Sequence, residues 1–284
     1  MTGSRSPFPR SAFLRSLSDG SFRPVIVGGC VAAFVMVLSP LAAIIWVSFF
    51  ENKIISFPPT GYTFDWYRAA AAMPQFRDGF FTSLELGVVA MLVSLVVGVP
   101  AALVLARGRF PGREAIQSLL LAPLIVPGIV AGAALYMFLI EVELASGVQV
   151  AMTFTGLAIA HSLIALPWTV RLVTASLVGL DPQLKEAALT MGAREFTAFR
   201  LVTWPLIRPG VVAGALFAFI ASFVDLEKSL FLVGPGMTTL PIVIVNYLEW
   251  SIDPTIAAVA TVQIAIISAG LVLTDRYFKL ARAF

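Results

Sequence analysis

Residues 86–106 read LGVVAMLVSLVVGVPAALVLA, a run of 21 residues without Asp, Glu, Lys or Arg. The hydrocarbon core of a bilayer is about 30 Å thick, and a helix needs roughly 20 apolar residues to cross it. Lipid offers no partner for unpaired backbone groups, so a helix is the expected form. This run therefore predicts a membrane-spanning helix.

Other uncharged runs of similar or greater length lie on both sides of it, at 24–50, 115–140, 144–170 and 254–274. A sixth run is uncharged over 209–224, and we interpret it as one helix from about Leu206 to Val233. The whole chain is 59% hydrophobic and only 12% charged, whereas about 25% of the residues in an ordinary soluble domain are charged. The sequence therefore predicts an all-α integral membrane protein with six transmembrane helices.

The positions of Lys and Arg predict the orientation. Of these 19 residues, 15 lie in the two tails, in the loop between spans two and three, or in and beside the loop between spans four and five. Loops rich in Lys and Arg face the cytoplasm, so both termini are expected there, which an even number of spans allows. We expect cytoplasmic tails at 1–23 and 277–284 and a transmembrane domain at 24–276.

Several classes of site are not expected in this chain. Cys30 is the single cysteine and His161 the single histidine, so there is neither a disulfide framework nor a metal-ligand cluster. No Gly-Lys pair occurs, so the chain has no P-loop of the G-x-x-x-x-G-K-[ST] form. The chain therefore cannot use ATP by itself through that motif. The basic pI needs no nucleic-acid partner, because the positive charge flanks the membrane.

The loop between spans four and five, about 179–205, carries clear helix signals. Asp181 is a good N-cap and Pro182 suits the first helical position. Helix-forming residues then continue until Gly192, which suits the left-handed residue that follows a helix. A second short helix is expected over 193–201.

The first of these helices has an apolar stripe made of Leu184, Ala187, Ala188 and Met191. Its small alanines permit close approach of another backbone. The stripe fits a docking element for a cytoplasmic partner, and it fits equally a surface helix that packs under its own bundle.

A resemblance favours docking. Glu186-Ala187-Ala188, followed by Gly192 and later by Pro205, resembles the EAA loop of ABC importer permeases, although Trp204 replaces the usual Leu. The resemblance extends over the six-span core and implies a type I, binding-protein-dependent ABC importer permease. In that family this loop forms the coupling helices that sit in a groove of the ATPase. The coupling role is carried over to Glu186, Ala187, Ala188 and Gly192, with Leu184 and Met191 beside them.

The resemblance also implies a transport subunit that is not an enzyme and binds no cofactor itself, and it implies partners and a location. The partners are an ABC ATPase dimer that holds ATP and Mg, a second permease subunit that is a homologous but different chain, and a periplasmic or surface solute-binding protein. The location is the bacterial cytoplasmic (inner) membrane, with lipid as the surroundings and no nucleic acid involved.

Residues 221–225 (ASFVD), 230–236 (LFLVGPG) and 239–241 (TLP) resemble the spermidine/putrescine-type subgroup. Val224 stands where an acidic residue is usual, and Glu227-Lys228 interrupt a run that is usually apolar. The implied cargo is a small polar organic solute, either a polyamine or a related cationic or zwitterionic compound such as an opine, aminoethylphosphonate or an amino-acid-like solute.

The candidate pathway residues are Asp225, Glu227, Lys228, Tyr136 and His161. Asp225 and Lys228 are three residues apart and can pair on one helix face. They form either a self-satisfied pair at the outer helix end or a charged lining at the outer mouth of the pathway, where Glu227 is available to a cationic cargo. His161 either bonds to a neighbouring helix or lines the pathway, and Tyr136 either packs or lines it.

Two other functions stay open at this point. An ion-coupled secondary transporter often has inverted repeats and several ionisable groups at mid-membrane, and neither is clear in this chain. A non-transporting membrane assembly subunit would use the 179–205 loop for docking alone.

Overall fold

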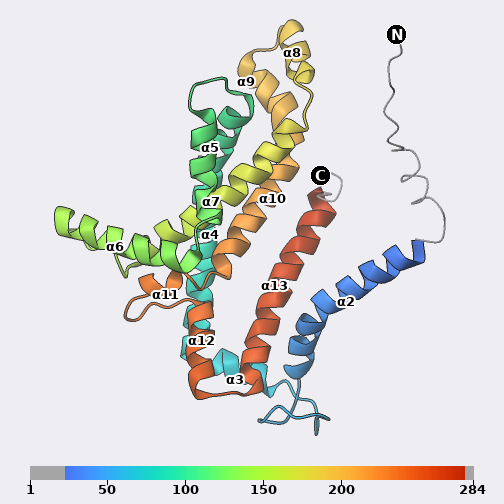
Figure 1. Ribbon diagram of the computed structural model, residues 1–284, viewed down its shortest axis with the longest axis vertical. Helices are drawn as coiled ribbons and strands as arrows, with labels where there is room; N and C mark the ends of the chain where they lie inside the picture. The colour runs from blue at the N-terminus through green and yellow to red at the C-terminus, as the bar shows by residue number, and fades with distance from the viewer. Residues whose placement is uncertain (1–22, 279–284) are drawn as a thin grey trace, which may run out of the picture.

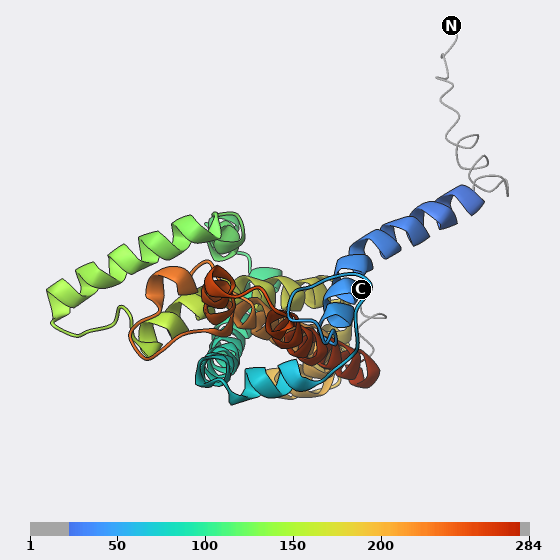
Figure 2. The same cartoon turned by 90° about the horizontal axis from the view of Figure 1, so that it is seen from below.

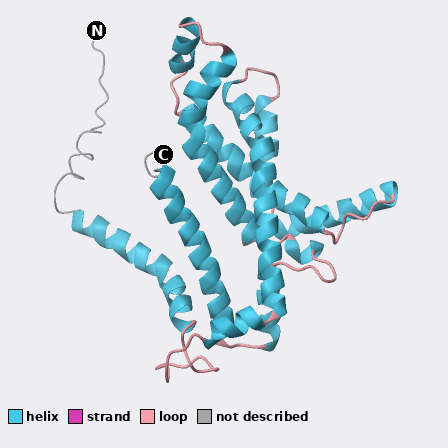
Figure 3. Ribbon diagram, turned by 180° about the vertical axis from the view of Figure 1, so that it is seen from behind, coloured by secondary structure: helices cyan, strands magenta, loops and turns pink. Residues whose placement is uncertain are grey.

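The computed structural model describes residues 23–278. Most of the two predicted tails therefore lies outside the described residues, including five of the basic residues used for the orientation: Arg5, Arg10, Arg15, Lys279 and Arg282. The described chain consists of helices and loops without a β-strand (Figure 3). Six of its helices are long and apolar enough to cross a membrane, which confirms the predicted number.

Four of these six are single helices that lie close to predicted runs: α2 (Arg23–Val47), α4 (Pro74–Arg107), α7 (Phe154–Val178) and α13 (Pro254–Phe278). The helices α4 and α7 are displaced from the uncharged runs by up to about a dozen residues. Helix α4 begins well before Leu86 and takes in Arg77, Asp78 and Glu85 in its outer turns. Counting uncharged residues therefore located the spans but not their ends.

The third span differs from the prediction. The run 115–140 is divided between α5 (Arg113–Leu121), a 3-10 turn (Ala122–Leu124) and α6 (Gly128–Ser146). Pro123 and Pro127 cause the break, because proline lacks an N–H and restricts the residue before it. Helix α6 then extends sideways from the bundle (Figures 1 and 2).

The fifth span also differs. The segments α9 (Glu195–Ala198), a π-helical stretch (Phe199–Thr203) and α10 (Trp204–Phe223) form one continuous helix, Glu195–Phe223, which we call the rod. The predicted separate helix at 193–201 is thus the beginning of this span. The predicted single helix 206–233 is wrong at its other end, because the rod stops at Phe223. Asp225 then accepts the backbone N–H groups of Lys228 and Ser229, which starts the short helix α11 (Ser229–Leu232) instead.

Helices α4, α7 and α10 form the centre of the bundle, and small residues let them approach closely. A β-carbon added to Gly98 would lie 3.0 Å from Thr169 Cγ2, and one added to Gly214 would lie 3.1 Å from Thr169 Cα. Ser94 Oγ and Thr169 Oγ1 share a buried hydrogen bond of 3.0 Å. The same three helices each contribute one alanine to a buried cluster, Ala90, Ala165 and Ala218.

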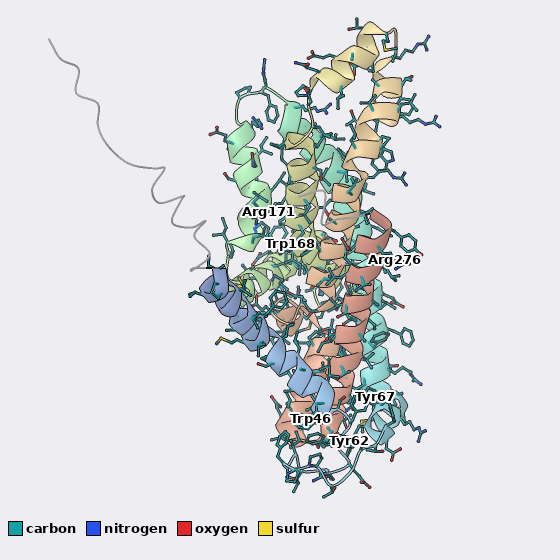
Figure 4. The ribbon with its side chains drawn as sticks, turned by 90° about the vertical axis from the view of Figure 1, so that its right-hand side faces the viewer. Trp46, Tyr62, Tyr67, Trp168, Arg171 and Arg276 are labelled. Carbon is teal, nitrogen blue, oxygen red and sulfur yellow. The ribbon has the colours of Figure 1, made fainter. Side chains whose placement is uncertain are left out.

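One end of the molecule is closed by α3 (Asp65–Ala72) and α12 (Leu240–Trp250). The first N–H of α12, from Leu240, donates to Ser83 Oγ of α4 at 2.8 Å. Aromatic side chains gather beside this end, where Trp46 Nε1 donates to Tyr62 OH at 3.2 Å and Tyr67 OH bonds Ser48 Oγ at 2.6 Å (Figure 4). Such residues are typical of a membrane–water interface.

The opposite end carries α8 (Gln183–Thr190), while α11 lies level with the middle of α13 (Figure 1). Asp225 Oδ2 accepts the N–H of Ser229, the first residue of α11, so Asp225 lies beside α11 at mid-bundle and not in the outer part of the membrane as expected. That expectation assumed a straight helix through Val233. Because the rod ends at Phe223, the chain still has α12 to form before it reaches the α3 end.

Candidate functional site

The α8 loop adopts the expected helix–glycine–helix form. Asp181 Oδ1 accepts the N–H of Gln183 at 2.9 Å, which caps the first turn of α8. At the other end Gly192 has φ +88°, and Ala193 N donates to Ala188 O at 3.0 Å. The predicted left-handed glycine is therefore confirmed, and it turns the chain sharply from α8 into the rod.

The apolar stripe of α8 faces outward. Leu184 is 48% exposed and Met191 is 89% exposed, and Glu186 and Ala187 are exposed beside them, whereas Ala188 is half-buried. No residue of α8 is buried. The stripe thus does not pack under the bundle of this chain, and it presents an apolar surface at the tip of the molecule (Figure 1).

Three residues of this loop were not singled out from the sequence. Lys185 Nζ lies 2.6 Å from Glu195 Oε2 and joins α8 to the first residue of the rod. Phe196, in the first turn of the rod, is 72% exposed. Opposite charges ten residues apart, on either side of a turn glycine, are the sequence signal that points to such a pair.

A buried set of hydrogen bonds surrounds His161 on α7, which is 1% exposed. Its Nδ1 lies 2.8 Å from Ser222 Oγ on α10, and its Nε2 lies 3.1 Å from Ser229 Oγ on α11. Ser229 Oγ donates to Asp225 O at 3.0 Å, so it accepts from His161, which assigns the ring proton to Nε2. Ser222 then donates to Nδ1. These bonds agree with the first of the two interpretations of His161, that it bonds to a neighbouring helix.

Asp225 and Lys228 form the predicted pair, with Lys228 Nζ 3.2 Å from Asp225 Oδ1. Both are buried, at 8% and 9% exposure. Asp225 Oδ2 also accepts the N–H groups of Lys228 at 3.0 Å and Ser229 at 3.3 Å. The carboxylate is therefore both the partner of Lys228 and the cap of α11, so its buried charge is well compensated.

Glu227 has a different environment, because its side chain is 52% exposed and lies 3.7 Å from Lys228 Nζ. Its carboxylate contacts Gly128 at the start of α6, where a β-carbon would overlap Oε2. A helix N-terminus favours a negative charge. At Gly132, one turn along α6, a β-carbon would lie 3.0 Å from Glu227 O and Lys228 Cα. Helix α6 thus packs directly on residues 225–228, which we call the charged segment.

The remaining candidate, Tyr136, is half-buried in an apolar cluster that includes Leu139 and Leu157. Lys228 instead lines a cavity of about 400 Å³ between α5, α6 and α7, where the other lining residues include Pro123, Leu135 and Ile164. Lys228 is the one charged residue of this lining. The structure therefore brings together His161, Asp225, Glu227 and Lys228, while Tyr136 packs in the adjacent apolar cluster.

No group of three or more His, Cys, Asp or Glu residues that could hold a metal ion occurs within 23–278. The charged side chains of Asp225, Glu227 and Lys228 instead contact one another, and the hydroxyl groups beside them bond His161. Their arrangement suits recognition of a polar or charged solute and offers no metal chemistry of its own.

The known proteins that resemble this chain are membrane subunits of transport systems. The family described as binding-protein-dependent transport system inner membrane component matches residues 94–280. The putrescine transport system permease protein PotI of Escherichia coli is 28% identical over 251 residues, 88% of each chain. The spermidine/putrescine transport system permease protein PotC of the same organism is 28% identical over 254 residues, 88% of this chain and 94% of that one. The molybdenum transport system permease protein ModB of Mycobacterium bovis is 32% identical over 220 residues, 74% of this chain and 83% of that one.

Solved structures share the fold. A bacterial ABC transporter that imports the acidic polysaccharide alginate matches with a TM-score of 0.67 at 17% identity, covering 96% of this chain and 100% of that one. The methionine ABC transporter MetNI, in an inward-facing conformation, matches with a TM-score of 0.58 at 19% identity, covering 72% and 95%. The matched family region includes α7, α8, the rod and α13, and so contains both the loop and the charged segment.

Proposed function

The chain belongs to the family of binding-protein-dependent transport system inner membrane components, and on this premise we propose that it forms half of the solute pathway of an importer whose ATPase docks on α8. As a member of this family it is the permease subunit of an ABC importer and not an enzyme. It works in the bacterial cytoplasmic membrane with both termini in the cytoplasm. Its partners are an ATPase dimer that holds ATP and Mg, a second and different permease chain, and a solute-binding protein on the opposite side.

The observation that carries the docking proposal is the outward-facing stripe of α8. Leu184 and Met191 expose apolar surface at the tip of a helix that has no buried residue. Apolar side chains grouped in this way favour a protein partner. The rod begins directly after α8, so a partner that moves α8 would act on a transmembrane helix.

Gly192→Asp tests the docking role. An L-residue in the left-handed region costs roughly 1–2 kcal/mol, so this change should distort the turn between α8 and the rod. We expect the variant to insert into the membrane at the wild-type level, and we expect at least a tenfold loss of the ATPase subunit that copurifies with the tagged chain.

Gly112→Asp is the matched control. Gly112 has φ +82° and, like Gly192, no atom within 4 Å of an added β-carbon, but it lies in the turn before α5 and outside the α8 loop. We expect the amount of ATPase that copurifies with this variant to remain within about twofold of the wild-type amount. An equal loss of copurifying ATPase in both glycine variants, or no loss in either, would contradict docking on α8.

The cargo proposed is a polyamine or a related cationic or zwitterionic solute. The half-exposed carboxylate of Glu227 beside Lys228 supports it, since an ammonium group can approach Glu227 from the open side without breaking the Asp225–Lys228 pair. Relatives named for putrescine and spermidine transport support the same class.

Three substitutions test the pathway. Glu227→Gln should lower uptake of radiolabelled putrescine at least fivefold in vesicles that contain the complete importer, while the amount of folded protein stays unchanged. Asp225→Asn and Lys228→Met each break a buried pair, so we expect both to lower the folded amount as well. Wild-type uptake by Glu227→Gln would show that Glu227 does not line the pathway. Wild-type uptake by all three variants would show that no part of the charged segment lines it.

A further inference from the structure

Helix α8 has few constraints on its orientation. None of its residues is buried, and it ends at Gly192, whose φ of +88° makes a sharp turn. Backbone hydrogen bonds from Gly192 N to Leu189 O at 2.9 Å and from Ala193 N to Ala188 O at 3.0 Å close the turn itself. These bonds define the C-terminal end of α8, whereas its first turn follows α7 after the short connection 179–182.

The first turn of α8 is held by the pair of Lys185 and Glu195. Their charged atoms are 2.6 Å apart, with the two side chains 31% and 72% exposed. Glu195 is the first residue of the rod, where a negative charge also favours the helix N-terminus. The pair therefore links the N-terminal half of α8 directly to the rod and closes a loop of about ten residues.

The far end of the rod reaches the charged segment. From Glu195 to Phe223 the rod has 29 residues, a length of about 43 Å at 1.5 Å per residue. Ser222, one residue before its end, bonds His161 at 2.8 Å, and Asp225 with its partner Lys228 follows within the next turn of chain. One helix thus connects the α8 tip with the buried polar residues at mid-bundle (Figure 1).

From this arrangement we infer that the Lys185–Glu195 pair is a positioning device, which makes α8 and the rod move as one body. A displacement of α8 then reaches the Ser222 end of the rod. Without the pair, α8 rotates between its connection to α7 and the turn at Gly192, and less of the displacement passes to the rod. This inference rests on the proposed function, because it needs a partner that moves α8. Neither residue belongs to the apolar stripe that is proposed to meet that partner.

The competing explanation is an ordinary surface ion pair. Exposed pairs typically contribute only 0–1 kcal/mol to stability, so the pair is not needed for folding. Removing one charge should therefore leave the fold and the α8 surface intact. The two explanations differ in whether the Ser222 end of the rod still responds to the partner.

The test uses Lys185→Met, Glu195→Gln and the exchanged pair Lys185→Glu with Glu195→Lys, in a Cys30→Ser background. Spin labels are placed at the exposed positions Val224→Cys, just beyond the rod, and Val262→Cys on α13. The distance between the labels is measured in the assembled importer before and after trapping with MgATP and vanadate. Asp65→Asn, which removes the exposed Arg68–Asp65 pair of 3.1 Å at the other end, is the matched control.

We expect each single variant to retain the ATPase within about twofold and to lose at least half of the vanadate-induced distance change. The exchanged pair should restore the change to within about a quarter of the wild-type value, and Asp65→Asn should leave it unaltered. A full change in both single variants, or no recovery in the exchanged pair, would overturn the inference. If the wild-type chain retains no ATPase, the proposed function itself fails, which is a separate result.

Discussion

At the scale of single residues, His161 joins α7 to the turn between α10 and α11, which lies more than 60 residues further along the chain. Its two ring nitrogens bond hydroxyl groups at the end of α10 and the start of α11. A buried polar group stabilises a fold only when it has its partners, and here each hydroxyl and each ring nitrogen has one. His161 therefore holds the turn between the rod and α11 against α7, next to the Asp225–Lys228 pair.

His161→Phe keeps a ring of similar shape and removes both hydrogen bonds. We expect the free energy of unfolding to fall by about 1–3 kcal/mol, because Ser222 is left buried without its partner and Ser229 loses the donor from the ring. Thermal unfolding in detergent, followed by tryptophan fluorescence, measures this change. Ser39→Ala, which removes an exposed hydroxyl bonded within its own helix, should change stability by less than about 0.5 kcal/mol. Equal stability of the two variants would contradict a structural role for His161.

At the scale of elements, α6 reaches the charged segment through two glycines on one face. Gly128 and Gly132 are four residues apart, and both face the chain around Glu227 and Lys228. Side chains would hold α6 away from this segment, because the contacts at Gly132 are to backbone atoms that have little room to move. The break at Pro123 and Pro127 gives α6 its crosswise direction, and the glycines then set how closely it packs.

Gly132→Leu should separate α6 from α11. A leucine there would overlap Glu227 O and Lys228 Cα, so we expect a loss of about 1–3 kcal/mol in unfolding free energy. Greater protease sensitivity in the 224–236 segment, mapped by mass spectrometry, should accompany it. Gly28→Leu is the control, because Gly28 is also helical and has no atom within 4 Å of an added β-carbon. The packing argument fails if the two leucines have the same effect.

At the scale of the whole molecule, the fold has two ends with different chemistry. The α8 end presents the outward-facing stripe and many of the basic residues of the predicted cytoplasmic loops. The other end is closed by α3, α12 and the aromatic loop around Trp46 and Tyr62 (Figure 4). Arg171 on α7 and Arg276 near the end of α13 lie away from this aromatic end in the same view. The excess of positive charge and the docking surface thus coincide, as a cytoplasmic α8 end requires.

Labelling of single cysteines tests this orientation. In a Cys30→Ser background, Ile54→Cys at the α3 end should react with a membrane-impermeant maleimide in intact spheroplasts. Thr190→Cys at the end of α8 should react after the membrane is permeabilised, and its labelling in intact spheroplasts should be at least tenfold lower. Both positions are exposed in the fold, so a lack of reaction reports the membrane side and not burial. The reverse pattern would invert the predicted topology.

The sequence by itself determined the features that depend on local chemistry. Apolar length predicted six spans, because lipid requires long runs of helix regardless of how the spans pack. The turn of the α8 loop was predictable as well, because Asp181 caps its own neighbours and Gly192 takes a left-handed conformation that other residues avoid. The resemblance of Glu186-Ala187-Ala188 to the EAA loop identified the family before any fold was known.

The tertiary structure alone decided the features that depend on competition between distant groups. In the sequence, Asp225 and Lys228 could pair equally well on a helix that continues through 224–233. In the structure the rod ends at Phe223, and Asp225 accepts backbone N–H groups while it pairs with Lys228. The partners of His161 and the contact of Glu227 with Gly128 likewise join residues that are far apart in the sequence, so no local pattern records their proximity. Their positions follow from packing, which brings segments together only after each helix has formed.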